Sequence, residues 1–222
     1  MKPADGTANG KRGRVLIADD HCLVAAGLSK LLESDFTVLG YVSDGRELVE
    51  RAKLDQPDAM VVDISMPNLN GIEAARQIRA AMPGAKLVFV SVHSDIQYVA
   101  AAFRAGASGY VLKRSAASEL VAAVHAMLNN EMYLTPLIDR AALQQALSTE
   151  GRGRTVLSPR QREVLQLVAE GRRGKEIARI LRISTKTVEF HKGLIAKKLD
   201  LHSVAELTRY AMEHEIAAVE RS

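Results

Sequence analysis

Cysteine is almost absent from this chain of 222 residues, in which Cys22 stands alone. A single thiol cannot form an internal disulfide, and it excludes a metal site built from clustered cysteines. Long apolar runs are also missing, since none approaches the roughly 20 residues that a membrane helix needs. The first residues, MKPADGTANGKR, lack the apolar core of a signal peptide and are predicted to belong to a disordered leader, residues 1–13. We therefore expect a cytoplasmic protein with no membrane partner.

Charge is divided unevenly along the chain. Residues 1–150 carry 15 Lys and Arg against 17 Asp and Glu, a net charge of −2, whereas residues 151–222 carry 15 against 9, a net charge of +6. A basic C-terminal third points to a polyanionic partner. From charge alone, these basic residues could equally well serve only to keep a helical surface solvated.

Composition also marks a boundary between two parts. From residue 135 to 155 the pattern loses strand character, passes through the helix-compatible stretch IDRAALQQAL and ends in STEGRGRT, whose glycines and charges cannot build a core. The sequence thus predicts a linker at 131–155, between a first domain at 14–130 and a second at 156–218.

Short β-branched runs alternate with longer amphipathic stretches in the first domain. The predicted strands are RVLIA (14–18), FTVLGY (36–41), AMVVD (59–63), KLVFVS (86–91) and SGYVLK (108–113). Apolar residues recur at helical spacing between them. Five strands joined by helices require a parallel sheet that is covered on both faces. This is a doubly wound α/β fold, whose ligands bind beyond the carboxyl ends of the strands.

Polar side chains stand at those strand ends. Asp19 and Asp20 end the first strand, Asp63 the third, Ser91 the fourth and Lys113 the fifth. Three carboxylates at one edge would be driven toward protonation unless a cation lay among them, and oxygen ligands suit Mg²⁺ better than zinc. Taken singly, the aspartate pair could cap the next helix and Lys113 could be solvated. Their joint placement is what predicts a metal and a phosphoryl group.

The motifs DD, VVDISMPNLNGIEAARQIR, SVH and GASGYVLK closely resemble the receiver domain of bacterial two-component response regulators over about residues 14–130. The resemblance implies a flavodoxin-like fold in which Asp63 takes a phosphoryl group from a phosphohistidine of a sensor histidine kinase. Asp19, Asp20 and Asp63 would bind Mg²⁺ together with the Ser65 backbone carbonyl. Lys113 would help to neutralise the phosphoryl oxygens.

The same resemblance implies a switch. Ser91 would move toward the phosphoryl group, and Tyr110 would turn inward to fill the space that Ser91 leaves, although Tyr110 could equally be an ordinary strand aromatic. Ser65 and His93 would flank the attacking water and tune the lifetime of the acyl phosphate. The fourth helix (about 95–105), the fifth strand and the fifth helix (about 116–128) would carry the signal.

The second domain is predicted to be all helical. LSPRQREVLQLVAEG has Ser158 as N-cap, Pro159 at the first helical position and Gln161 three residues after the cap. KEIARIL, a tight turn and TKTVEFHKGLIAKKL, capped by Ser184, form a helix-turn-helix, whose second helix enters the DNA major groove. The last helix, in SVAELTRYAMEH, is either a packing helix or a dimer contact.

These segments resemble the LuxR-type DNA-binding domain, which follows a receiver in response regulators of the NarL/FixJ type. The lysines of the second helix are expected to bind phosphates, as is Thr187. Glu189 either accepts a hydrogen bond from cytosine N4 or selects against wrong sequences. The candidate DNA contacts are Lys186, Thr187, Glu189, Lys192, Gly193, Lys197 and Lys198.

The sequence therefore predicts a phosphorylation-switched transcription regulator that transfers a phosphoryl group only to and from itself and is otherwise not an enzyme. Its expected partners are a sensor histidine kinase, double-stranded DNA and a second copy of the chain once phosphorylated or DNA-bound, with RNA polymerase as a further candidate. A phosphatase of the haloacid dehalogenase type would need a carboxylate two residues after Asp63, where Ser65 stands. A receiver that acts only as a constitutive interaction module is the other alternative.

Overall fold

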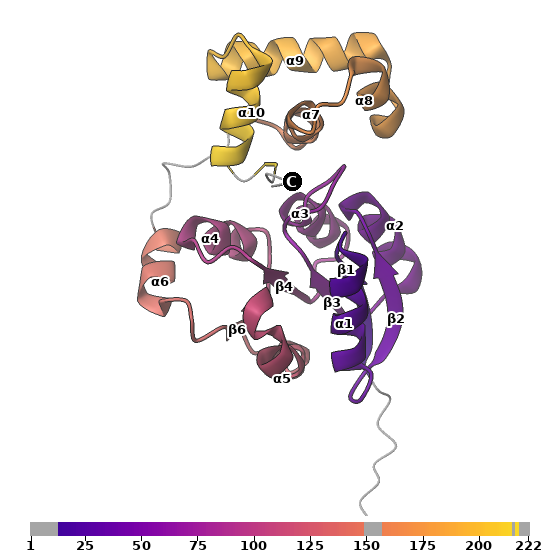
Figure 1. Ribbon diagram of the computed structural model, residues 1–222, viewed down its shortest axis with the longest axis vertical. Helices are drawn as coiled ribbons and strands as arrows, with labels where there is room; N and C mark the ends of the chain where they lie inside the picture. The colour runs from indigo at the N-terminus through magenta and orange to yellow at the C-terminus, as the bar shows by residue number, and fades with distance from the viewer. Residues whose placement is uncertain (1–12, 149–156, 215, 218–222) are drawn as a thin grey trace, which may run out of the picture.

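The computed structural model describes residues 13–148, 157–214 and 216–217. An N-terminal α/β domain is followed by a smaller helical domain (Figure 1). The expected leader, apart from Gly13, lies outside the described residues, and so do residues 149–155 of the expected linker. In the part of the chain that is described, no helix is both long enough and apolar enough to cross a membrane.

Six strands, all paired in parallel, form the sheet in the order β2-β1-β3-β4-β5-β6. The first five follow the flavodoxin-like order, so the predicted fold class is confirmed. The strands are β1 (Arg14–Ala18), β2 (Thr37–Val42), β3 (Ala59–Val62), β4 (Leu87–Ser91), β5 (Gly109–Leu112) and β6 (Tyr133–Leu134). The helices of this domain are α1 (Cys22–Leu32), α2 (Gly45–Asp55), α3 (Gly71–Ala81), α4 (Ile96–Arg104), α5 (Ala116–Leu128) and α6 (Arg140–Ser148).

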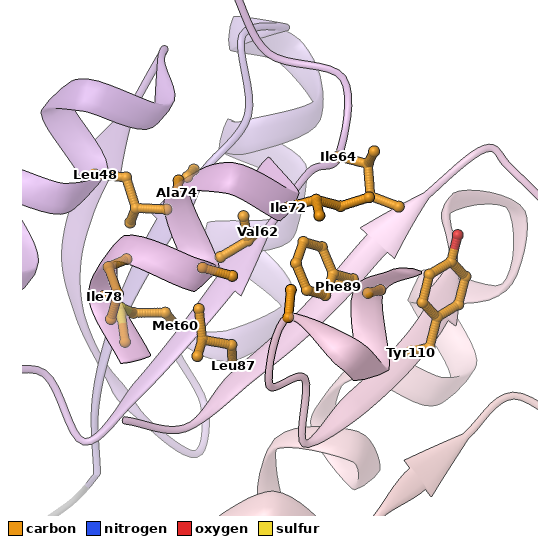
Figure 2. Packing of buried hydrophobic residues seen from close by; sticks show 14 of the residues in the cluster. Leu48, Met60, Val62, Ile64, Ile72, Ala74, Ile78, Leu87, Phe89 and Tyr110 are labelled. Atoms are coloured by element: carbon orange, nitrogen blue, oxygen red, sulfur yellow. The ribbon is translucent and has the colours of Figure 1, made fainter. Parts of the chain in front are cut away.

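Two apolar layers lie on opposite faces of the sheet because successive strand residues point to opposite sides. Met60 and Phe89 belong to a cluster with residues of α2, α3 and α4 on one face, and Figure 2 shows them with Leu48 of α2 and Ile72 of α3. Val61 and Val90 pack with residues of α1 and α5 on the other. Both faces are buried, which is why the central strands read as continuous apolar runs.

The sheet has one strand more than the five that the sequence predicts. Tyr133 and Leu134 pair with Gly109 and Tyr110, inside the stretch assigned to the linker. Next, α6 packs against α4 and buries Leu143 in the domain core. A strand of two residues shows no alternation, so the period-2 pattern could not reveal it. As a result β6 and α6 cover part of the face that was expected to carry the signal.

The described residues of the second domain form four helices, α7 (Pro159–Ala169), α8 (Gly174–Leu181), α9 (Thr185–Leu199) and α10 (Val204–Glu213). Ser158 and Gln161 form a reciprocal capping box at α7, and the Ser184 hydroxyl accepts a hydrogen bond from the Thr187 amide at α9. Val188 and Ile195 of α9 are buried in the core of this domain. The predicted helix-turn-helix is thus formed by α8 and α9.

Gly71 lies where the fold leaves no room for a side chain. A Cβ atom at this position would lie 2.0 Å from the Asp63 carbonyl oxygen, which belongs to buried backbone at the end of β3. We expect Gly71→Ala to lower the free energy of unfolding by about 1–3 kcal/mol, because the chain must shift to relieve the overlap. Urea denaturation measures this change.

Gly27 supplies the matched control. It lies in the middle of α1, is exposed, and a Cβ there would meet no atom within 4 Å. Gly27→Ala should raise the free energy of unfolding by about 0.5–1 kcal/mol, since alanine loses less backbone entropy in a helix. A Gly71→Ala protein as stable as the wild type would contradict this view of the β3–α3 junction.

Candidate functional site

Three carboxylates converge at the carboxyl edge of the sheet. The Asp63 amide donates to the Ala18 carbonyl at 2.8 Å, which places the end of β3 beside the end of β1. Asp19 and Asp63 are 1% and 3% exposed, and Asp20 is partly buried. One oxygen from each of the three and a ring nitrogen of His21 all lie within 4.8 Å of one another.

Lys113 compensates part of this negative charge. It follows β5, and its ammonium Nζ lies 2.7 Å from Oδ2 of Asp19 and 2.7 Å from Oδ2 of Asp63. Burial raises the pKa of Asp63 to about 6, against the lowering effect of Lys113 and with a further increase from Asp19. Burial alone would lower the pKa of Lys113, but the carboxylates of Asp63 and Asp19 outweigh it and the pKa is raised. The lysine is therefore held as a cation among the aspartates.

The aspartate pair does not cap α1. The N-cap residue is His21, which makes no side-chain cap bond, and its amide donates instead to Asp19 Oδ1 at 2.9 Å. His21 Nδ1 also lies 2.9 Å from Asp20 Oδ1. Sequence reasoning missed this histidine, although its place directly after the two aspartates was a signal. The carboxylates fit a hard divalent cation, because several oxygen ligands can approach it at once.

Ser91 is the last residue of β4, and His93, two residues later, connects this strand end to the β3–α3 loop. Ser91 is fully buried, and its Oγ accepts a hydrogen bond from the His93 amide at 3.2 Å. The imidazole Nε2 of His93 lies 3.1 Å from Oγ of Ser65, and the ring stacks on Tyr98 with centroids 4.0 Å apart. Burial and the charge of Lys113 lower the pKa of His93. Ser65 and His93 thus bridge the two loops, and Tyr98 is a further member that the sequence did not reveal.

Tyr110 points inward. It is fully buried and lies beside Phe89 at the margin of the apolar cluster (Figure 2). Its hydroxyl donates to the His93 carbonyl at 2.8 Å. The ring therefore couples β5 to the loop that follows Ser91.

Helix α9 presents a mixed surface on the side of its domain that is remote from the sheet (Figure 1). Lys186, Glu189, Gly193, Lys197 and Lys198 are exposed. Several of the candidates already have partners within the domain: Lys192 pairs with Glu189 at 3.2 Å, Lys198 donates to Gln161 at 3.2 Å, and Thr187 bonds Ser184 at 2.8 Å.

Two features of this surface were not predicted. Phe190 is 63% exposed, because Val188 and Ile195 already occupy the buried side of α9. Between the starts of α8 and α9 lies a hollow of about 740 Å³, which Arg173 and Lys175 line together with Glu189. These two cations extend the basic surface beyond α9.

Comparison with known families assigns both domains. Residues 15–125 match the response regulator receiver domain, and residues 155–211 match the luxR family of bacterial regulatory proteins. The chain is 33% identical over 213 residues to the oxygen regulatory protein NreC of Staphylococcus carnosus, with 91% of this chain and 98% of that protein covered. It is also 33% identical over 207 residues to the transcriptional regulatory protein MctR of Rhizobium johnstonii, covering 92% and 95%.

Solved structures agree. One is RcsB from Salmonella enterica serovar Typhimurium, bound to a promoter in the presence of phosphomimetic BeF3−. Its sequence is 28% identical to this chain, the match covers 91% of this chain and 99% of RcsB, and the TM-score is 0.60. The response regulator ChrA of a heme-sensing two-component system is 32% identical, with a TM-score of 0.50 and coverage of 93% of this chain and 100% of that one. The chain belongs to the two-component response regulators that join a receiver domain to a LuxR-type DNA-binding domain.

Proposed function

We propose that this protein takes up a phosphoryl group on Asp63 and that this modification controls DNA binding by its C-terminal domain and hence transcription. The observation that carries the proposal is the buried contact of Lys113 with both Asp19 and Asp63 at the carboxyl edge of the sheet. Two buried carboxylates repel an incoming anion. They can belong to a site for a phosphoryl group only when cations lie beside them.

The chemistry needs few parts. A carboxylate oxygen of Asp63 attacks the phosphorus of a kinase phosphohistidine, the P–N bond breaks, and the histidine leaves with the electron pair of that bond. Lys113 can bind the phosphoryl oxygens after transfer, because its side chain is flexible and its ammonium group already lies next to Asp63. Water later cleaves the acyl phosphate and releases inorganic phosphate. No separate substrate is turned over.

Asp19, Asp20 and Asp63, with the Ser65 carbonyl, are the groups proposed to hold Mg²⁺. When bound, the ion supplies positive charge that offsets the phosphoryl oxygens. The acidic donor set and the raised pKa of Asp63 support this assignment, since a nearby cation favours the ionised carboxylate.

Ser91 and Tyr110 are the proposed switch residues. Both contact the same short segment, Ser91 through the His93 amide and Tyr110 through the His93 carbonyl. A displacement of Ser91 toward a phosphoryl group would therefore disturb the backbone of His93, to which Tyr110 is also bonded. The contact between Ser65 and His93 lies over the same loops and is proposed to regulate access of the hydrolytic water.

Helix α9 is the proposed reader of DNA, with phosphate contacts from Lys186, Lys192 and Lys197. Thr187 and Lys198 are proposed as further phosphate contacts, and Glu189 and Gly193 as residues that face the bases. Phe190 joins this set because an exposed aromatic can pack on a thymine methyl group.

The partners proposed for this chain are a sensor histidine kinase, double-stranded DNA, RNA polymerase and a second copy of the chain. Receiver domains accept phosphoryl groups from such kinases, and the exposed Val204 of α10 offers an apolar contact to the second copy. We place the protein in the cytoplasm, where the kinase domain of its sensor and DNA are found. The cytoplasm also keeps the thiol of Cys22 reduced.

The first prediction concerns the nucleophile. Wild-type protein incubated with acetyl phosphate and magnesium should gain one phosphoryl group in its intact mass, and Asp63→Asn should gain none, because an amide cannot form the acyl phosphate. The fold of the variant is checked by urea denaturation. A variant that still gained mass would remove Asp63 from this role, and a folded wild type inert to both acetyl phosphate and kinase would favour the constitutive interaction module.

The second prediction concerns the metal. Magnesium should raise the melting temperature of the wild type, with a stabilisation of about 2.7 kcal/mol when its concentration is 100 times the Kd. Asp20→Asn should lose most of this increase, because one ligand charge is gone. The exposed Asp200 lies in the other domain, so Asp200→Asn should respond as the wild type does. Equal melting shifts in all three proteins would contradict the site.

The third prediction concerns DNA. Replacing Lys192 and Lys197 with alanine should weaken binding and reduce the slope of log K against log salt by about 1.8, since each lost phosphate contact removes about 0.9. The exposed receiver lysines Lys30 and Lys53 form the control pair. Fluorescence anisotropy at several salt concentrations measures the slope. An unchanged slope would place the DNA interface elsewhere on the domain.

A further inference from the structure

His21 brings a nitrogen donor to the acidic cluster at the carboxyl edge of the sheet. One of its ring nitrogens and one oxygen each of Asp19, Asp20 and Asp63 lie within 4.8 Å of one another. The helix that follows does not use this ring, because His21 occupies the N-cap position of α1 and makes no side-chain cap bond. The imidazole is therefore available to an ion that enters the cluster.

Asp19 presents its two oxygens to different neighbours. Oδ2 lies 2.7 Å from the ammonium of Lys113, whereas Oδ1 accepts a hydrogen bond from the His21 amide at 2.9 Å and lies 3.4 Å from Nδ1 of its ring. Lys113 thus takes one side of Asp19, and His21 takes the other together with Asp20. The side chains of His21 and Asp20 are 64% and 20% exposed, so an ion can reach this second side from solvent.

The contact between His21 and Asp20 has the spacing of two metal ligands without being a hydrogen bond. Nδ1 of His21 lies 2.9 Å from Oδ1 of Asp20. This oxygen is buried, yet it accepts no hydrogen bond from the described part of the chain. Adjacent ligands of an octahedral ion with bonds of roughly 2.1 Å are about 3 Å apart. A dication bound to both atoms would compensate the buried oxygen at the spacing that is already present.

We propose that His21 is a further ligand of this metal site and shifts its selectivity from Mg²⁺ toward borderline first-row dications such as Ni²⁺ and Zn²⁺. The inference deepens the proposed function and rests on it, because the three aspartates supply the other ligands. Carboxylates suit hard ions such as Mg²⁺, whereas imidazole nitrogen suits zinc, nickel and copper. A site with both kinds of donor accepts both classes of ion, and His21 sets the ratio between them.

A purely electrostatic role for His21 has a different consequence. An imidazolium beside Asp20 would repel every dication alike, so its removal would strengthen the binding of Mg²⁺ and Ni²⁺ together. A direct nitrogen ligand acts through a coordination bond, and its loss weakens the borderline ion most. The ratio of the two dissociation constants therefore separates the two roles.

The test compares the full-length wild type with His21→Gln, which keeps a polar side chain but removes the ring nitrogen. Calorimetric titration with Mg²⁺ alone and with Ni²⁺ alone gives the two Kd values. Loss of a group that only supports a metal ligand costs about 10–100-fold in affinity, so loss of the ligand itself should lower the preference for Ni²⁺ over Mg²⁺ about tenfold or more. Mg²⁺ should also compete with Ni²⁺, because both ions need Asp20.

His202→Gln is the matched control. His202 is an exposed histidine of the other domain, and its Nε2 lies 3.4 Å from Oδ1 of Asp200. This variant should keep the ion preference of the wild type. Electron paramagnetic resonance with one equivalent of Cu²⁺ supplies a second readout: nitrogen coupling should be present in the wild type and in His202→Gln and should be lost in His21→Gln.

A preference for Ni²⁺ that is equal in all three proteins would overturn the inference, and so would a parallel change of both Kd values in His21→Gln. A loss of preference in His202→Gln as well would place the nickel site elsewhere and overturn it too. If the wild type binds Ni²⁺ but not Mg²⁺, the magnesium assignment of the proposed function fails, whereas the Kd for Ni²⁺ still decides whether His21 is a ligand.

Discussion

Asp19 and Asp63 are buried side by side at the carboxyl edge of the sheet, and the repulsion between them is the constraint on which the rest of the site depends. Lys113 reaches both carboxylates, and burial still raises the pKa of Asp63 to about 6. A second positive charge next to these carboxylates would lower the electrostatic cost of keeping both of them ionised. Phosphoryl transfer requires the same arrangement, since the incoming group brings negative charge that needs compensation.

The residues around the site form one connected set of contacts. Ser91, His93 and Tyr110 are joined through one backbone segment, and His93 also meets Ser65 across the opening. Tyr110 itself packs in the apolar cluster that also contains residues of α4, so this set of contacts extends from the strand ends into the core. Helix α6 packs against α4, so a segment of the chain itself covers part of this helix.

The domain interface includes the loop that follows Asp63. Ion pairs such as Arg162 with Glu73 add little net stability when the cost of burying both charges is counted, but they fix the register of α7 on α3. Gln166 then bonds two backbone groups that have the correct spacing only in this register. The interface is therefore selective rather than strong.

Much of this protein follows from its sequence alone. The fold class, the caps at Ser158 and Ser184 and the helix-turn-helix are local properties, because they depend on residues a few positions apart. The convergence of Asp19, Asp63 and Lys113 also follows, since parallel strands bring their carboxyl ends to one edge. Only the tertiary structure decided the two-residue strand β6, the exposure of Phe190 and the pairing of Gln166 with a loop about a hundred positions earlier. Periodicity and capping rules cannot reach such contacts, because they form between surfaces whose relative placement is set by the packing of the whole chain.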